Sequence, residues 1–148
     1  MEQPLLPVGC VIMASGLARR FGSNKLLADF GGRPLLCRAL DATNTPQLAA
    51  RIVVTRSAEV EALCKAEGVP CLVHGLPGRN DTVRLGLDAL LAARPDLAGC
   101  MFLPGDQPLL QRETVESMVG IFGWDTKTRI ERQKETEREI FRLAHRFV

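Results

Sequence analysis

Short apolar runs alternate with segments of helical periodicity along the first two thirds of the chain. Four runs have the length and the apolar, β-branched content of buried strands: "GCVIMA" (9–14), "RIVVT" (51–55), "PCLVHG" (70–75) and "GCMFLPGD" (99–106). Three intervening segments are predicted to be helices, at residues 34–43, 57–67 and 81–94. The third is the clearest, because it carries a broad apolar stripe formed by Val83, Leu85, Leu87, Leu90 and Leu91.

This repeated order of strand, helix and strand predicts an α/β fold. Consecutive strands joined by helices pair in parallel, and the helices cover both faces of the sheet, which gives three layers. Ligands of such sheets bind beyond the carboxyl ends of the strands. We therefore expect the functional site to include the segments that follow "GCVIMA" and "GCMFLP".

The last part of the chain has a different pattern. From Gly123 the sequence "GWDTKTRIERQKETEREIFRLAHRFV" is rich in Arg, Lys and Glu, and apolar residues stay sparse until Ile140, Phe141, Leu143 and Phe147. This pattern predicts a solvated helix with one apolar end, with a partner-binding helix as the alternative. We expect one α/β domain over residues 1–122 and a charged helical tail over 123–148 that is not a separate domain.

Composition narrows the classes of function. The 148 residues carry 19 basic and 17 acidic side chains, a net charge of +2, so we expect neither a nucleic-acid nor a membrane partner. The five cysteines form no C-x-x-C pair, and most lie among apolar residues, as reduced structural thiols do. Without a secretory leader or an apolar run of membrane-spanning length, we expect a cytoplasmic protein.

A glycine-rich and basic stretch, "MASGLARRFGSNKLL" (13–27), follows the first apolar run. It is not a Walker A loop, because five residues separate its glycines and Lys25 follows an asparagine, and it lacks the G-x-G-x-x-G pattern of dinucleotide sites. The small turn Ala14-Ser15-Gly16 can direct its N–H groups at an anion, and Arg20 and Lys25 can reach the same space. Together these groups suit a triphosphate, although both cations are also compatible with ordinary solvated loop positions.

Other candidate residues lie at the ends of the remaining runs. Asp106 either binds a metal ion at the end of its strand or opens a turn with Pro108. Asn80 and Asp81 either cap the following helix or line a base pocket. His74 ends a strand, where a structural role is favoured over a functional one.

Four ordered motifs carry a family resemblance. The stretches "VIMASGLARRFGSNKLL", "GGRPLL", "NDTVRLGL" and "GDQPLL" resemble the signatures of the nucleotidyltransferases that transfer a nucleotide to the molybdenum cofactor, a family similar to the sugar-nucleotide pyrophosphorylases. The resemblance covers most of residues 8–120 and implies a Rossmann-like nucleotidyltransferase fold with a mostly parallel sheet. "GDQP" and the Ala-Ser pair resemble the cytidylyltransferase branch.

The resemblance also implies roles for single residues. Arg20, Lys25 and Asp106 would be catalytic, the first two by neutralising phosphates and Asp106 by holding Mg²⁺. The nucleotide would be bound by Ala14, Ser15, Gly16, Leu17, Arg20, Lys25, Asn80, Asp81, Thr82 and Asp106. Attack of an acceptor phosphate on the α-phosphorus builds negative charge, so cations and a hard metal suffice and no nucleophilic side chain is needed.

The expected reaction is transfer of CMP from CTP to a phosphorylated acceptor, most simply molybdopterin, with release of pyrophosphate. Ser15 at the base-binding turn leaves less room for a purine, which favours CTP over GTP. A guanylyltransferase, a sugar-1-phosphate nucleotidyltransferase and a non-catalytic nucleotide-binding module are the alternatives, and a molybdoenzyme or a homodimer is the candidate protein contact.

The chain departs from the family pattern at two places. Ala18 stands where the family usually has Ser, and the tail from Gly123 resembles none of the strands and the second acidic metal ligand that follow "GDQP" in the family. From this we expect a C-terminally truncated member.

Overall fold

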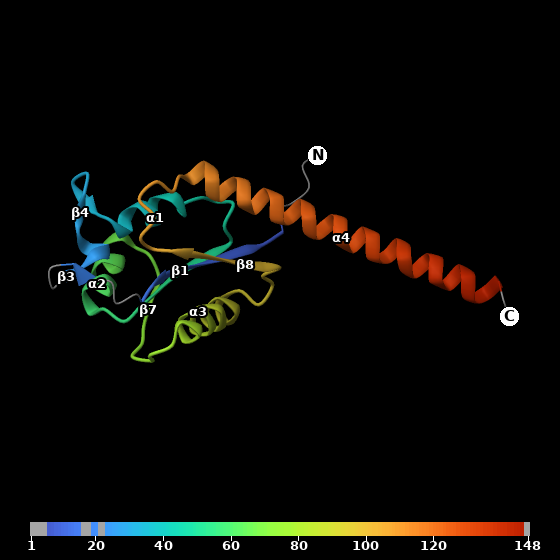
Figure 1. Cartoon of the computed structure of the whole chain (residues 1–148), viewed down its shortest axis with the longest axis horizontal. Helices are drawn as coiled ribbons and strands as arrows, with labels where there is room; N and C mark the ends of the chain where they lie inside the picture. Colours follow the sequence, from blue (N-terminus) through green and yellow to red (C-terminus); the bar gives the residue numbers. More distant parts are fainter. Residues whose placement is uncertain (1–5, 16–18, 21–22, 147–148) are drawn as a thin grey trace.

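The computed structural model describes residues 6–15, 19–20 and 23–146. Its central feature is a four-stranded parallel sheet in the order β7-β6-β1-β8 (Figure 1). The strands are β1 (Val8–Ala14), β6 (Ala50–Thr55), β7 (Cys71–Val73) and β8 (Gly99–Pro104). All four predicted strands are confirmed, and so is their parallel pairing. Gly16, Leu17 and Ala18 lie outside the described residues.

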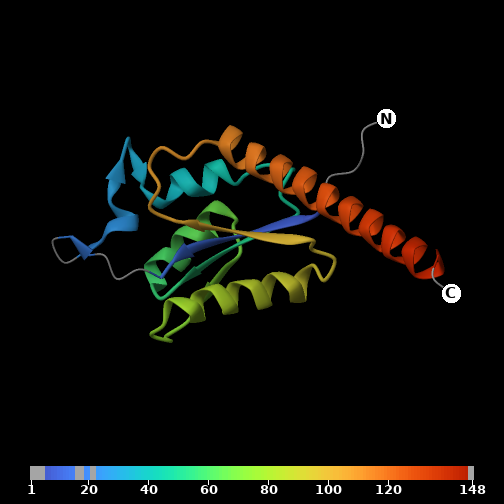
Figure 2. The same ribbon diagram turned by 45° about the vertical axis from the view of Figure 1, so that its right-hand side comes forward.

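Helices cover both faces of this sheet, as predicted. The principal helices are α1 (Leu36–Ala42), α2 (Ala58–Glu67), α3 (Arg79–Ala93) and α4 (Arg112–Arg146). The side chains of β1 alternate between two cores: Ile12 packs with residues of α1, α2 and α4, whereas Val11 packs with Val54 and with Leu90 of α3. Figure 2 shows α3 on one side of the sheet and α1 and α4 on the other. The central strand β1 is apolar along its whole length because both of its faces are buried.

The helix α3 lies very close to the sheet at Gly86. A Cβ atom at this position would stand 2.7 Å from Cγ1 of Val11 and 3.0 Å from Cγ2 of Val54. Glycine therefore allows α3 to approach the two central strands, and this fixes where the first turn of α3 sits relative to the ends of the strands.

Two small antiparallel ladders follow β1. The first pairs β2 (Arg19–Arg20) with β3 (Ser23–Asn24), and a 3₁₀ turn, η1 (Lys25–Leu27), follows it. The second pairs β4 (Asp29–Phe30) with β5 (Arg33–Pro34). Gly31 and Gly32 join this pair with φ angles of 66° and 91°, as a two-residue hairpin turn requires. The strands predicted from the sequence include neither ladder.

The helix α4 begins earlier than the charged tail does. It starts at Arg112, buries Val115 and Val119 against the sheet, and passes residue 122 without a break. Residues 132–136, 138 and 139 are exposed, and the helix extends away from the sheet (Figure 1). The sequence predicts a helical tail from Gly123, but the helix already starts at Arg112 because its first turns complete the core. Within the described part of the chain, no strand follows β8, and no helix has the length and apolar character needed to cross a membrane.

Candidate nucleotide site

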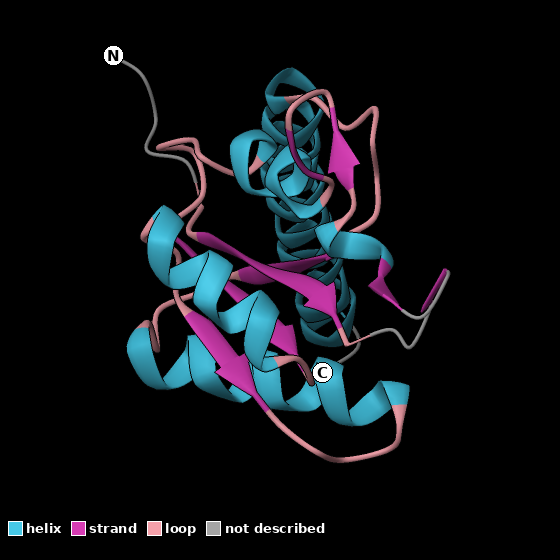
Figure 3. Cartoon of the chain, turned by 90° about the vertical axis from the view of Figure 1, so that its left-hand side faces the viewer, coloured by secondary structure: helices cyan, strands magenta, loops and turns pink. Residues whose placement is uncertain are grey.

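The carboxyl ends of the four parallel strands lie on the same side of the sheet. We call this side the carboxyl edge, and it carries the candidate site. The residues that follow β1, β6, β7 and β8 there include Ser15, Arg56, His74 and Asp106. Figure 3 views the molecule from the side that this edge faces. Parallel pairing therefore brings four segments that are distant in the sequence to a single place, as the α/β pattern predicted.

Lys25 and Asp106 approach one another at this edge. Lys25 Nζ lies 3.7 Å from Asp106 Oδ2, and the two side chains are 37% and 42% exposed. Asn24 caps η1 by accepting a hydrogen bond from the Leu26 N–H at 2.9 Å, which places Lys25 at the start of the turn. Gly105 donates its N–H to the Met13 carbonyl at 2.9 Å and anchors the "GDQP" turn beside the end of β1. A cation and a carboxylate thus lie close together and remain accessible to a solute.

Ser15, His74 and Thr82 form a polar network behind this edge. His74 Nε2 lies 3.1 Å from Ser15 Oγ and 3.2 Å from Thr82 Oγ1, and Nδ1 accepts a hydrogen bond from the Leu76 N–H at 3.1 Å. Since Nδ1 is the acceptor, the ring proton is assigned to Nε2, and this one donor is shared between the two hydroxyls. Ser15 Oγ in turn donates to the Val54 carbonyl at 3.2 Å. Both hydroxyl residues are buried, at 7% and 2% exposure.

Arg56 connects two of the loops at this edge. Its Nη1 donates to the Ser15 carbonyl and its Nε to the Leu76 carbonyl, each at 2.8 Å. Beside it, Thr55 Oγ1 donates to the Ala14 carbonyl at 2.9 Å. The end of β6 therefore holds both the turn after β1 and the segment after β7. Arg56 was not among the sequence candidates, although a basic residue directly after the run "RIVVT" was a usable signal.

Asn80 and Asp81, both in the first turn of α3, differ in their roles although the sequence analysis treats them together. Asp81 accepts a hydrogen bond from the Gly78 N–H at 3.0 Å and one from Arg84 Nη2 at 3.1 Å, which confirms it as a capping residue. Asn80 is exposed in the same turn and does not cap the helix, because the cap position is Gly78, two residues earlier.

The backbone of Arg20 lies in β2, paired with Ser23.

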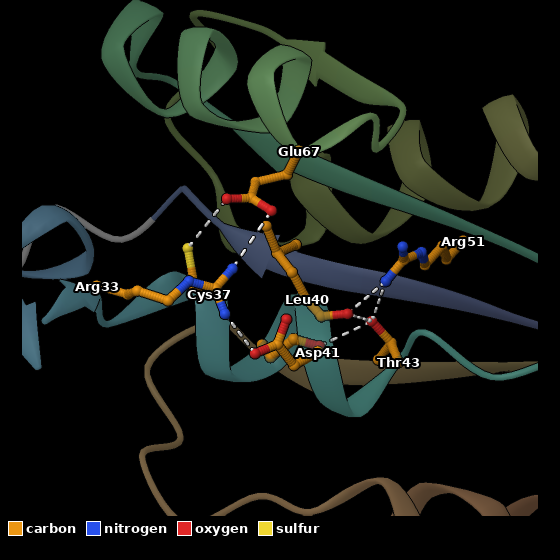
Figure 4. Close-up of polar contacts among 8 residues, drawn as sticks. Arg33, Cys37, Leu40, Asp41, Thr43, Arg51 and Glu67 are labelled. Atoms are coloured by element: carbon orange, nitrogen blue, oxygen red, sulfur yellow. Dashed lines mark hydrogen bonds and ion pairs between the residues drawn. The ribbon is translucent and has the colours of Figure 1, made fainter. Parts of the chain in front are cut away.

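A second polar cluster lies away from the site, between α1 and α2 (Figure 4). Arg33 Nη1 donates to Asp41 Oδ2 at 2.6 Å, and its Nη2 lies 3.3 Å from Glu67 Oε2. Arg51 Nη1 donates to Thr43 Oγ1 at 2.9 Å. These bonds connect α1 with α2 and β6, and they stabilise the packing of these elements.

Four of the five cysteine thiols are poorly suited to nucleophilic chemistry, whereas a hydrogen bond with Cys64 lowers the pKa of the half-buried Cys71. All five are free, and Cys10, Cys37 and Cys64 are buried. Burial raises the pKa of the Cys10 thiol to about 12, and burial also raises the pKa of Cys37 and Cys100. Because the thiolate is the nucleophile, these groups are inert near neutral pH. Across the described residues, no three His, Cys, Asp or Glu side chains gather closely enough to hold a metal ion by themselves.

Comparison with known proteins decides the family. The pattern of the MobA-like NTP transferase domain matches residues 10–141. The chain belongs to the MobA-like NTP transferase family. The match runs through the α/β part and into the charged portion of α4, beyond the range over which the four motifs carried the resemblance.

Curated relatives of this MobA-like chain act on different nucleotides. A molybdenum cofactor guanylyltransferase from Rhodopseudomonas palustris is 33% identical over 118 residues, which cover 77% of this chain and 54% of the relative. A 3-deoxy-manno-octulosonate cytidylyltransferase from Polynucleobacter asymbioticus is 30% identical over 103 residues, which cover 67% of this chain and 41% of the relative. The chain thus spans about half the length of the curated relatives that it matches.

Solved structures agree with the family assignment at the level of the fold. Rv0371c from Mycobacterium tuberculosis superposes with a TM-score of 0.65 over 82% of this chain and 63% of that chain, at 19% identity. The expected Rossmann-like nucleotidyltransferase architecture with a mostly parallel sheet is confirmed. In this MobA-like domain, three of the four motif segments meet at the carboxyl edge, through Ser15 and Lys25, Thr82, and Asp106, whereas Arg33 of "GGRPLL" belongs to the cluster between α1 and α2.

Proposed function

We propose that this MobA-like domain transfers CMP from CTP to a phosphorylated acceptor, most simply molybdopterin, and releases pyrophosphate. The observation that carries the proposal is the placement of Lys25 beside Asp106 at the carboxyl edge of the sheet. A nucleoside triphosphate needs cations for its phosphates and a hard anionic ligand for its metal ion, and this pair supplies one of each.

The chain contributes binding and charge in this reaction. A phosphate oxygen of the acceptor attacks the α-phosphorus, the bond to the bridging oxygen of the pyrophosphate breaks, and that oxygen leaves with the electron pair. Lys25, which is 37% exposed, would turn from Asp106 to the triphosphate and neutralise the charge that builds on the leaving group. Arg20 and the N–H groups of the turn 14–16 are proposed to bind the same phosphates.

The residues at this edge fit Mg²⁺ as a cofactor. Asp106 is a partly exposed carboxylate, and Mg²⁺ is commonly bound through one or two carboxylates together with waters and substrate phosphates rather than by a cage of protein ligands. Bound in this way, the ion would polarise the phosphoryl oxygens and offset their charge. Asp106 would hold it, and no other described carboxylate is assigned to it.

CTP is proposed as the nucleotide because Ser15 occupies the turn that would face the base. The bonds from its buried side chain to His74 and Val54 fix the position of this turn, so the turn does not move aside readily for a larger ring. GTP is the second candidate, supported by the guanylyltransferase from R. palustris.

Pyrophosphate release tests the proposal. The chain would be incubated with Mg²⁺ and with labelled CTP or GTP, in the presence and absence of molybdopterin. We expect acceptor-dependent pyrophosphate release that is faster with CTP than with GTP. Faster release with GTP would make the protein a guanylyltransferase. Binding of CTP without any release would make it a nucleotide-binding module.

A further inference from the structure

The segments that follow β1, β6 and β7 are tied into one unit by two side chains outside the proposed phosphate and metal ligands. Arg56 joins the carbonyls of Ser15 and Leu76, and His74 joins the hydroxyls of Ser15 and Thr82. The His74 N–H also donates to the Thr55 carbonyl at 3.0 Å. Three loops and the first turn of α3 thus share one hydrogen-bond network.

The segment between β7 and α3 depends on this network for its position. Gly75, Leu76 and Pro77 are exposed and belong to no helix or strand. Both backbone polar groups of Leu76 are bound by the network, its N–H by His74 Nδ1 at 3.1 Å and its carbonyl by Arg56 Nε at 2.8 Å. The two side chains therefore determine how far this segment stands from Ser15.

We infer that Arg56 and His74 are positioning residues for nucleotide selection: they tie the turn at Ser15 to the segment 75–77, so that the spacing of these two segments limits the size of the base. This inference rests on the proposed function, in which the turn 14–16 faces the base. Neither side chain is required to touch the nucleotide. Arg56 is suited to this task because its planar guanidinium presents separate donors to two carbonyls, which a lysine cannot do with the same geometry.

The matched control is Arg94, which makes similar bonds at the opposite edge of the sheet. Its Nη1 donates to the Ala49 carbonyl at 3.1 Å, and its Nε and Nη2 bind Asp96, each at 2.9 Å. Methionine keeps most of the length of the side chain and removes two bonds to backbone carbonyls at Arg56, and one such bond together with the pair with Asp96 at Arg94. Only the substitution of Arg56 loosens the loops at the carboxyl edge.

Substitutions of His74 separate its two tasks. Gln places an amide N–H₂ near the position of Nε2, so His74→Gln keeps a donor for Ser15 and Thr82 and loses the acceptor for the Leu76 N–H. Asn places its oxygen near the position of Nδ1, so His74→Asn keeps the acceptor and loses the donor. If the fixed position of Ser15 is what selects the base, His74→Gln should retain more discrimination than His74→Asn.

The experiment measures dissociation constants for CTP and GTP by calorimetry, together with melting temperatures, in the full chain and these four variants. The wild type should prefer CTP. We expect Arg56→Met and His74→Asn to weaken CTP binding about tenfold and GTP binding less, as loss of one or two hydrogen bonds predicts, with His74→Gln intermediate. Arg94→Met should lower the melting temperature and leave the preference for CTP unchanged.

The possible failures are distinguishable. If the wild type binds neither nucleotide, the proposed function is wrong and the inference falls with it. If the wild type binds CTP but Arg56→Met and Arg94→Met retain the same preference, only the inference is overturned. Should Arg56→Met fail to fold, His74→Gln and His74→Asn decide, and equal preference in both would overturn the inference.

Discussion

Lys25 Nζ lies 3.7 Å from Asp106 Oδ2, and this approach joins the segment after the first strand to the turn after the last. The two atoms are too far apart for a strong hydrogen bond, and both side chains are more than one third exposed. A pair of this kind adds at most about 1 kcal/mol to folding. Its substitution should therefore change ligand binding much more than stability.

Lys25→Ala should weaken CTP binding about tenfold or more, because a charge-assisted bond to phosphate is lost. The loss should shrink at high salt, where exposed charges are screened. Calorimetry at two ionic strengths measures both effects. Lys65→Ala is the matched control, since Lys65 is exposed in the last turn of α2 and faces no proposed ligand. Equal CTP affinity in Lys25→Ala and the wild type would contradict the role in phosphate binding.

Asp106→Asn should preserve folding and abolish the dependence of CTP binding on Mg²⁺. Asn keeps the size and turn-forming ability of Asp but lacks the charge that a hard cation needs. Titration of CTP with and without Mg²⁺, in the wild type and in the variant, measures this dependence. An equal enhancement by Mg²⁺ in both proteins would show that Asp106 only opens the turn with Pro108.

Gly86→Ala should destabilise the domain by roughly 1–3 kcal/mol, the usual cost of overpacking a core. The added Cβ would meet the stiff, fully buried side chain of Val11 at 2.7 Å. Gly120→Ala is the control, because a Cβ at this exposed helical position meets nothing within 4 Å and should stabilise the helix by roughly 0.5–1 kcal/mol. Urea denaturation measures both, and a neutral Gly86→Ala would mean that α3 shifts away from the sheet at little cost.

The free energy of unfolding should fall as the pH rises from 9 toward 12, because of Cys10. Burial raises the pKa of this thiol from 9.0 to about 12. The folded state therefore retains a proton that the unfolded state loses, and stability is complete below pH 9 and decreases above it. One such group contributes a slope of at most about 1.4 kcal/mol per pH unit.

Denaturation of the wild type and of Cys10→Ala across this pH range isolates that slope. The chain has no tyrosine, so no phenol titrates in the same window. The slope should be shallower in the variant, although Cys37 and Cys100, whose pKa values are also raised, retain part of it. Identical slopes would show that Cys10 ionises in the folded protein as readily as in the unfolded chain.

The sheet and its helices could be predicted from the sequence because their signals are local. A strand buried on both faces is mostly apolar, and a helix that packs on such a sheet carries an apolar stripe. Patterns of a few residues therefore predict β1, β6, β8 and α3. Alternation of the two patterns then requires parallel pairing. The same pattern predicts a candidate site at the carboxyl edge that includes Lys25 and Asp106, and the structure places these two side chains side by side.

Only the tertiary structure decided which side chains meet. Arg56 touches Ser15 and Leu76, and His74 touches Thr82, through bonds between segments that no local period relates. The start of α4 at Arg112 could not be predicted from the sequence either. Two valines, Val115 and Val119, do not mark a buried helix face by themselves, and their burial depends on the packed core. Local patterns record what each segment must bury, whereas the hydrogen bonds that shape a site depend on distances that exist only once the segments have packed together.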